Sequence, residues 1–87
     1  MKHTASLRFW RCYHSLPPVI RDLADKNFAL LKADPSHPSL QFKRLAGRRL
    51  HSVRVGLHYR ALGLPTDQGV HWFWIGSHAD YDRLIGE

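Results

Sequence analysis

Four side chains of three chemical types lie near the ends of short apolar segments, and together they are suited to phosphodiester chemistry on RNA. Arg54 and Arg60 interrupt the stretch HSVRVGLHYRALG, residues 51–63, and His78 and Tyr81 follow the apolar run VHWFWI. In RNA the ribose 2′-OH can attack the adjacent phosphorus if its proton is withdrawn and the leaving 5′ oxygen is protonated. Arginine stabilises the extra charge of that transition state through planar, bidentate hydrogen bonds, and histidine suits the proton transfers.

Each of these residues also has an ordinary structural explanation. Arg60 could pair with Asp80 or Asp82, His78 could cap the last segment, and Tyr81 could pack beneath it. Four such residues in one small sheet favour the chemical interpretation over four separate structural ones.

The basic charge is concentrated in one window. The 87 residues contain 13 Lys and Arg against 7 Asp and Glu, a net charge of +6, and no acidic residue occurs between Asp34 and Asp67. The basic side chains of this window are Lys43, Arg44, Arg48, Arg49, Arg54 and Arg60. One explanation of this window is a basic, solvated surface that binds nothing. Because side chains of a sheet can converge on one face, the window favours a polyanionic partner, either nucleic acid or the acidic face of another protein.

The spacing of the histidines and of the single cysteine gives little support to a metal site, and no cofactor-binding motif is found. The seven histidines, at 3, 14, 37, 51, 58, 71 and 78, form no HxxH or HxxxH pair, and there is no CxxC. The segment from His78 through Asp80 to Asp82 is a weak candidate for a cation site. Phosphate-binding glycine motifs and GxSxG are absent from the sequence, and the lone Cys12 is expected to be a small core residue. We therefore expect no metal and no cofactor.

The same features predict a cytoplasmic protein without a membrane partner. No apolar run approaches the ~18–20 residues that span a bilayer, and the N-terminus lacks the apolar stretch of a secretory signal. A single cysteine cannot form an internal disulfide.

Two helices are predicted in the first half of the chain. Aromatic residues at three-residue steps suit a short amphipathic helix over residues 7–16, although a strand is also possible there. Apolar residues then recur at the helical period from Val19 to residue 33, with Ser15 as a possible cap and Pro17-Pro18 in the first turn. Leu23, Phe28 and Leu31 are expected to face the core.

Strands are predicted in the second half. The segments are 41–45, 50–55, 59–62 and 70–75, with a tight basic turn at 46–49, a hairpin loop at 63–69 and a tail capped by Ser77. Alternation directs Val53 and Val55 to one face and Ser52 and Arg54 to the other, and it places Trp72 and Trp74 together under the helices. The prediction is a single α+β domain over residues 1–87, with two N-terminal helices packed on a three- to four-stranded antiparallel sheet, a short C-terminal tail and a free second face.

Nearly the whole chain, from about Phe9 to Ile85, resembles the RelE/ParE superfamily of toxins from type II toxin–antitoxin modules. The resemblance is carried by LPPVIRDLADKNFALLKADPSHPSLQFKRL, by HSVRVGLHYRALG and by WFWIGSHADYD. It implies a growth-inhibiting toxin, a cognate antitoxin with an acidic segment as partner and, in the RNA-cleaving branch, metal-independent cleavage of mRNA in the ribosomal A site.

By resemblance, Arg60 contacts the scissile phosphate, and His78 and Tyr81 complete the catalytic set. Arg54 falls on a basic family position, and we expect it to bind RNA together with Lys43, Arg44, Arg48 and Arg49. Ser52 stands where the most basic ribonuclease members have lysine, and residues 35–66 contain no glutamate. The other branch of the superfamily poisons DNA gyrase without cutting RNA. A gyrase-directed toxin and a non-catalytic, antitoxin-binding member therefore stay open as alternatives.

Overall fold

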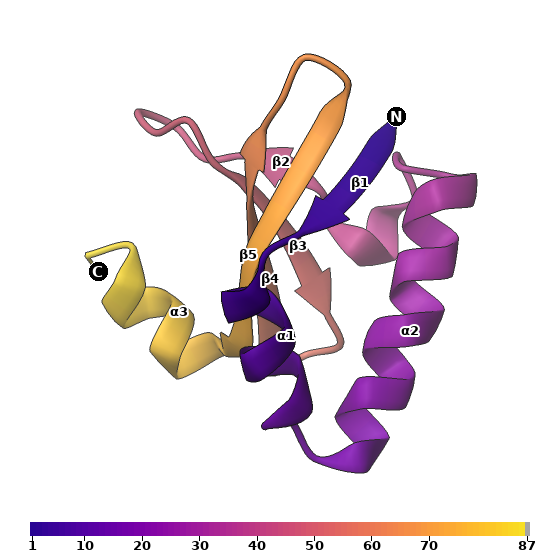
Figure 1. Cartoon of the computed structure of the whole chain (residues 1–87), viewed down its shortest axis with the longest axis vertical. Coiled ribbons are helices and arrows are strands. Elements are labelled where there is room, and N and C mark those ends of the chain that lie inside the picture. Colours follow the sequence, from indigo (N-terminus) through magenta and orange to yellow (C-terminus); the bar gives the residue numbers. More distant parts are fainter. Residues whose placement is uncertain (87) are drawn as a thin grey trace.

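In the computed structural model, which describes residues 1–86, a twisted sheet carries helices on both faces (Figure 1). In chain order the elements are β1 (Lys2–Ala5), α1 (Leu7–His14), α2 (Pro18–Ala33), the short 3-10 helix η1 (Pro38–Leu40), β2 (Lys43–Arg44), β3 (His51–Val55), β4 (Tyr59–Pro65), β5 (Gly69–Ser77) and α3 (His78–Leu84). Within these residues no helix is long and apolar enough to cross a membrane.

The sheet is mixed, which corrects the expected three- to four-stranded antiparallel sheet. Its five strands lie in the order β1-β5-β4-β3-β2, and β1 runs parallel to β5 while the other neighbours are antiparallel. The N-terminal strand was not expected because KHTA is short and polar. It becomes a strand by pairing with the central β5, where Lys2 aligns with Gly69 and Ala5 with Trp72.

The helices begin and end close to the predicted positions. Ser6 caps α1 by accepting a hydrogen bond from the Phe9 amide at 3.1 Å. Ser15 is the C-terminal cap of α1, so its expected role at the start of the next helix is wrong, and α2 instead begins with Pro18 after Pro17. Proline fits this first turn because its missing N–H would have no partner there.

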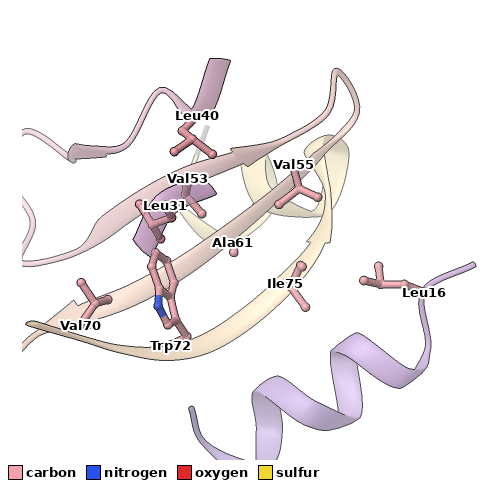
Figure 2. Close-up of a cluster of buried hydrophobic side chains, with 9 residues drawn as sticks. All are labelled: Leu16, Leu31, Leu40, Val53, Val55, Ala61, Val70, Trp72 and Ile75. Atoms are coloured by element: carbon pink, nitrogen blue, oxygen red, sulfur yellow. The ribbon is translucent and has the colours of Figure 1, made fainter. Parts of the chain in front are cut away.

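One hydrophobic cluster lies between the sheet and the first two helices. Figure 2 shows its buried side chains, which are Leu16, Leu31, Leu40, Val53, Val55, Ala61, Val70, Trp72 and Ile75. Of the three helix residues expected in the core, Leu31 is buried and Leu23 packs at its margin, whereas Phe28 is 40% exposed. Val53 and Val55 face this cluster, as the alternation predicted.

A bulge in β5 separates the two tryptophans that were expected on one face. Leu62 aligns with Trp74 but its neighbour Gly63 aligns with Trp72, so the register shifts and one extra residue, Phe73, is accommodated in β5. Trp72 therefore packs in the cluster under the helices, while Trp74 lies in a second cluster. The expectation that both indoles share one face is wrong.

The second face of the sheet is partly covered, which corrects the expectation of a free face. Leu62, Trp74 and Tyr81 are buried together there, with Leu45 and Ile85 packed against them. Tyr81 belongs to α3 and Ile85 follows it, so the short tail forms a helix that docks on this face. The part of this face that carries Arg54 and Arg60 lies beside α3.

Candidate active site

Arg54 and Arg60 lie opposite each other on the face that carries α3. In the β3–β4 ladder Arg54 aligns with Arg60, between the Val53–Ala61 and Val55–Tyr59 pairs. Since Val53, Val55 and Ala61 belong to the main cluster, the alternation of strands directs both arginines to the opposite side. Like charges directly opposite each other weaken a sheet, so this pair suits an anion better than it suits the fold.

The structure brings Arg60, His78 and Tyr81 into mutual contact. The Nε of Arg60 lies 3.3 Å from Nδ1 of His78 and donates a hydrogen bond to it. The Arg60 guanidinium carbon lies 5.5 Å from the centre of the Tyr81 ring, and the rings of His78 and Tyr81 stack with centroids 5.7 Å apart. Three residues from β4 and α3 thus form one cluster, and all three are among the candidate catalytic residues of the sequence analysis.

The start of α3 positions His78. Ser77 caps the helix, because its side chain accepts a hydrogen bond from the Asp80 amide at 3.2 Å. The His78 amide donates to the carbonyl of His58 at 2.7 Å, which ties the first helical residue to the β3–β4 turn. The predicted cap is therefore confirmed, and it is Ser77, not His78, that supplies it.

His78 lies between a cation and a carboxylate. Its Nδ1 accepts from Arg60, so a neutral ring carries its proton on Nε2, which lies 3.6 Å from Oδ2 of Asp82. Within residues 1–86, Asp80 pairs with Arg83 and Asp82 with His78. Neither carboxylate neutralises Arg60, so the alternative in which Arg60 serves only as an ion-pair partner is not what the fold shows.

One nitrogen of Arg60 has no hydrogen-bond partner in the part of the chain that the structure describes. This is the buried Nη1 of the guanidinium. Arg54 is better satisfied, since its Nε donates to the carbonyl of Gly56 at 3.1 Å. A buried donor without a partner costs free energy, and more so when it is charged. Arg60 thus has hydrogen-bonding capacity that an anion could use after a small movement of the side chains over it.

The other four basic residues of the window do not form one patch around this cluster. Lys43 aligns with Ser52 and so shares the face of the arginines, whereas Arg44 aligns with His51 on the other side. Burial lowers the pKa of His51, and the positive charge of Arg44 lowers that pKa further. The guanidinium of Arg48 donates to the carbonyl of Ile85 and so holds the end of α3.

The side chain of Ser52 is closed off from solvent, so a ligand on the surface could not reach it. It is fully buried, and its Oγ has no hydrogen-bond partner within residues 1–86. Its strand neighbour in β4 is Leu62, which belongs to the cluster under α3. The position at which the resemblance implies lysine in the most basic ribonuclease members is therefore buried in this chain, beside a residue of the cluster under α3.

Two contributors to the cluster were missed by the sequence analysis. Asp82 was weighed only as a metal ligand or an ion-pair partner of Arg60, although its four-residue spacing from His78 is a signal for a pair on one helix face. Gly76 aligns with Arg60, and a Cβ there would lie 2.5 Å from Cζ2 of Trp74. Glycine thus lets the indole lie across β5 at this level, and no local sequence signal indicates that.

Fold and cluster together define a small basic protein in which a mixed sheet presents two arginines beside a C-terminal helix. The profile of the ParE-like toxin domain family matches residues 18–83. The chain belongs to this family, and hence to the RelE/ParE superfamily of toxins from toxin–antitoxin modules. Among curated protein sequences, none matches the chain.

Solved structures of toxins share the fold. The RelB-RelE antitoxin-toxin complex from Methanococcus jannaschii matches with a TM-score of 0.73 at 14% identity, over 94% of this chain and 98% of that one. The isolated RelE toxin from E. coli matches with a TM-score of 0.65 at 14% identity, over 97% of this chain and 94% of that one. The RelBE2 toxin-antitoxin complex from Mycobacterium tuberculosis matches with a TM-score of 0.62 at 25% identity, over 88% of this chain and 96% of that one. The predicted superfamily is confirmed.

Proposed function

We propose that this toxin is a ribosome-dependent mRNA endonuclease that acts without a metal, with Arg60, His78 and Tyr81 as its catalytic cluster. The observation that carries the proposal is the contact of Arg60 with both His78 and Tyr81, beside a second arginine with no carboxylate on either guanidinium in the described residues. The two arginines offer positive charge for a phosphate. Nδ1 of His78, 3.3 Å from Nε of Arg60, offers a proton acceptor beside that charge.

The proposed reaction starts at the ribose 2′-OH. Its oxygen attacks phosphorus and forms the new P–O bond, while the bond from phosphorus to the 5′ oxygen breaks. Arg60 turns its guanidinium from His78 to the phosphate and stabilises the added charge. Nδ1 of His78, freed from its hydrogen bond, takes the 2′-OH proton and passes it to the departing 5′ oxygen. Asp82 faces Nε2 and keeps the ring in the tautomer that this step needs.

Two more residues have supporting roles in this proposal. Tyr81 is only 6% exposed, so it acts by stacking against Arg60 and His78 rather than by stacking on a base. Arg54 and Lys43 extend the positive face along β3 and β2 and hold the RNA backbone. Arg44, Arg48 and Arg49 lie on or beside the β2–β3 turn, where they would meet ribosomal RNA.

The proposed partner in the resting cell is a cognate antitoxin. Two of the structural neighbours described above are antitoxin–toxin complexes. The guanidinium groups of Arg54 and Arg60 have no carboxylate partner in the described residues, so the face that carries them fits an acidic segment. Covering this face would shield the same guanidinium groups that a phosphate needs.

The test is cleavage of ribosome-bound mRNA by purified toxin. Arg60→Ala should lower the cleavage rate by about 10²–10³-fold, as the loss of a transition-state hydrogen-bond donor does. Arg8→Ala is the matched control, because Arg8 is an exposed arginine of α1 on the other face, and it should cleave like wild type. Full cleavage by Arg60→Ala at an unchanged melting temperature would contradict the proposal.

A gyrase-directed toxin is the second candidate, and Ser52 is the observation that favours it. The buried hydroxyl replaces a lysine of the most basic RNA-cleaving members, and the matching family is ParE-like. The discriminating measurement is DNA supercoiling by gyrase in the presence of the toxin. Inhibited supercoiling together with intact mRNA would replace the endonuclease proposal with this one.

A further inference from the structure

The backbone of β3 at Arg54 is tied to the helix α2. The strand β2 pairs with β3 at His51 and Ser52, so in the described residues β4 is the only strand beside Arg54. On α2, Nδ2 of Asn27 donates a hydrogen bond to the carbonyl of Arg54 at 3.2 Å. A backbone carbonyl of a sheet needs such a partner when no strand supplies one. The end of β3 is therefore held by a helix side chain instead of a further strand.

The turn that follows Arg54 packs on the same helix. Gly56 has a φ of 69°, in the left-handed region that favours glycine, and a Cβ there would lie 2.6 Å from Cδ2 of Leu23. The carbonyl of Gly56 accepts the hydrogen bond from Nε of Arg54 at 3.1 Å. Two groups orient the Arg54 side chain, its own backbone and this carbonyl, and residues of α2 place both of them.

The guanidinium of Arg54 has few other restraints. Within residues 1–86 neither of its Nη nitrogens has a hydrogen-bond partner, and the like charge of Arg60 stands directly opposite. That repulsion favours rotamers of Arg54 that point away from Arg60. An arginine held through Nε keeps both Nη groups for the oxygens of a phosphate. It is also ordered before RNA binds, which raises the affinity because less freedom is lost on binding.

We propose that Asn27 is a positioning residue for Arg54, which it orients toward the RNA backbone from the other side of the sheet. Asn27 touches no RNA and acts through its hydrogen bond to the Arg54 carbonyl, with the contact between Leu23 and Gly56 in support. The inference rests on the proposed RNA-binding role of Arg54. The competing explanation is a purely structural one, in which Asn27 only joins α2 to the sheet.

The first measurement is the affinity for a fluorescein-labelled single-stranded RNA, followed by fluorescence anisotropy. Asn27→Ala should weaken binding by about 2- to 10-fold, the cost of ordering one long side chain on binding. Ser36→Ala is the matched control, because it also removes one hydrogen bond without changing the charge, the 2.9 Å bond to Asp34, and it should bind like wild type. In an Arg54→Ala background Asn27→Ala should have no further effect, whereas in a Lys43→Ala background its full effect should remain.

Asn27→Leu is a second variant, which keeps the packing. Asn27 lines the apolar groove between α1, α2 and the sheet, a cavity of about 260 Å³, so a leucine of similar volume fits there and lacks the donor. Its second readout, the exchange of arginine Nε–H protons with water, is measured by NMR and needs no RNA. In wild type the Nε–H of Arg54 should exchange more slowly than that of the exposed Arg8. Asn27→Leu should abolish this difference, and Ser36→Ala should preserve it.

Losses of affinity that multiply when Asn27→Ala is combined with Arg54→Ala would overturn the proposal, because Asn27 would then act independently of Arg54. Wild-type RNA affinity together with unchanged exchange of the Arg54 Nε–H in Asn27→Leu would overturn it as well. Cleavage of ribosome-bound mRNA is measured separately, and there Asn27→Ala should raise KM and leave kcat near that of wild type. A wild type that binds RNA without cutting it would contradict the endonuclease proposal alone, and the affinities would still test Asn27. A wild type that binds no RNA would overturn the role of Asn27.

Discussion

At the scale of single residues, two arginines occupy positions in the sheet that cost the fold stability. Arg54 and Arg60 face each other across two strands, and Nη1 of Arg60 is buried without a partner in the described residues. Both features reduce stability. Because Arg60 also contacts His78, the surface formed by Arg54, Arg60 and His78 is the strongest candidate for a functional site.

Ser52 shows the opposite case, a polar residue that packing explains. Because its Oγ is buried and unpaired, we expect Ser52→Ala to unfold with a free energy equal to or above that of wild type, within about 1 kcal/mol. Ser52→Lys should lose several kcal/mol, since it buries a charge. Urea denaturation checks both variants. A loss of more than about 1 kcal/mol in Ser52→Ala would show that the hydroxyl has a partner, and slower mRNA cleavage would give it a role in the site.

At the scale of elements, α3 has two functions in one short helix. It covers Leu62 and Trp74 with Tyr81, and its first turn presents His78 to Arg60. Arg48 holds its far end through the Ile85 carbonyl, where a cation also suits the negative end of the helix dipole. Docking of this helix therefore assembles the candidate site.

The strand β1 is held through a histidine that must be neutral. Nε1 of Trp72 donates to Nδ1 of His3 at 3.1 Å, so that nitrogen cannot carry a proton. The folded-state pKa of His3 is lowered below its usual 6.5. The unfolded chain therefore binds more protons, and the contribution of His3 to stability is present above pH 6.5 and is lost as the pH falls through that value.

We therefore expect the melting temperature of the wild type to fall between pH 7.5 and pH 5, with part of this fall arising from His3. Replacing His3 by Gln should reduce the dependence on pH, because no proton is taken up at that position on unfolding. His14→Gln removes an exposed histidine of α1 and serves as the control. Equal pH dependence in His3→Gln and wild type would contradict the role of His3 in holding β1.

At the scale of the whole molecule, the sheet divides the surface into two faces with different properties. The face under α1 and α2 has the apolar groove, and the face beside α3 has the arginines. Arg54, Arg60 and Lys43 contribute positive charge to the second face.

Polyanion binding should follow this division. The affinity for a fluorescein-labelled single-stranded RNA should fall with salt on a log–log plot, and Arg54→Ala should lower the slope by about 0.7, the value for one lost phosphate contact on a single strand. Arg8→Ala should leave the slope unchanged if the arginine face is the binding surface. Fluorescence anisotropy between low and moderate salt measures both. An equal loss of slope in the two variants would mean that the charge acts without a defined site.

Much of the fold follows from local patterns in the sequence. The helical period gave α2 from residue 18 to 33, proline and serine marked the starts of helices, and alternation assigned Val53 and Arg54 to opposite faces. Those features depend on neighbours within a few positions, so the chain encodes them directly. The resemblance to the RelE/ParE superfamily also came from the sequence, and it named the three residues that the structure brings together.

Other features depended on pairing between distant segments, and only the tertiary structure decided them. The bulge at Phe73 is defined by the partner strand β4, and it sends Trp72 and Trp74 to opposite faces. The strand β1 exists because β5 offers it a parallel edge, and α3 docks on the sheet because Leu62 and Trp74 create an apolar surface for it. Register, edge pairing and helix docking are contacts between segments that are distant in the sequence. A one-residue shift in strand register alone exchanges the faces of every later residue in that strand.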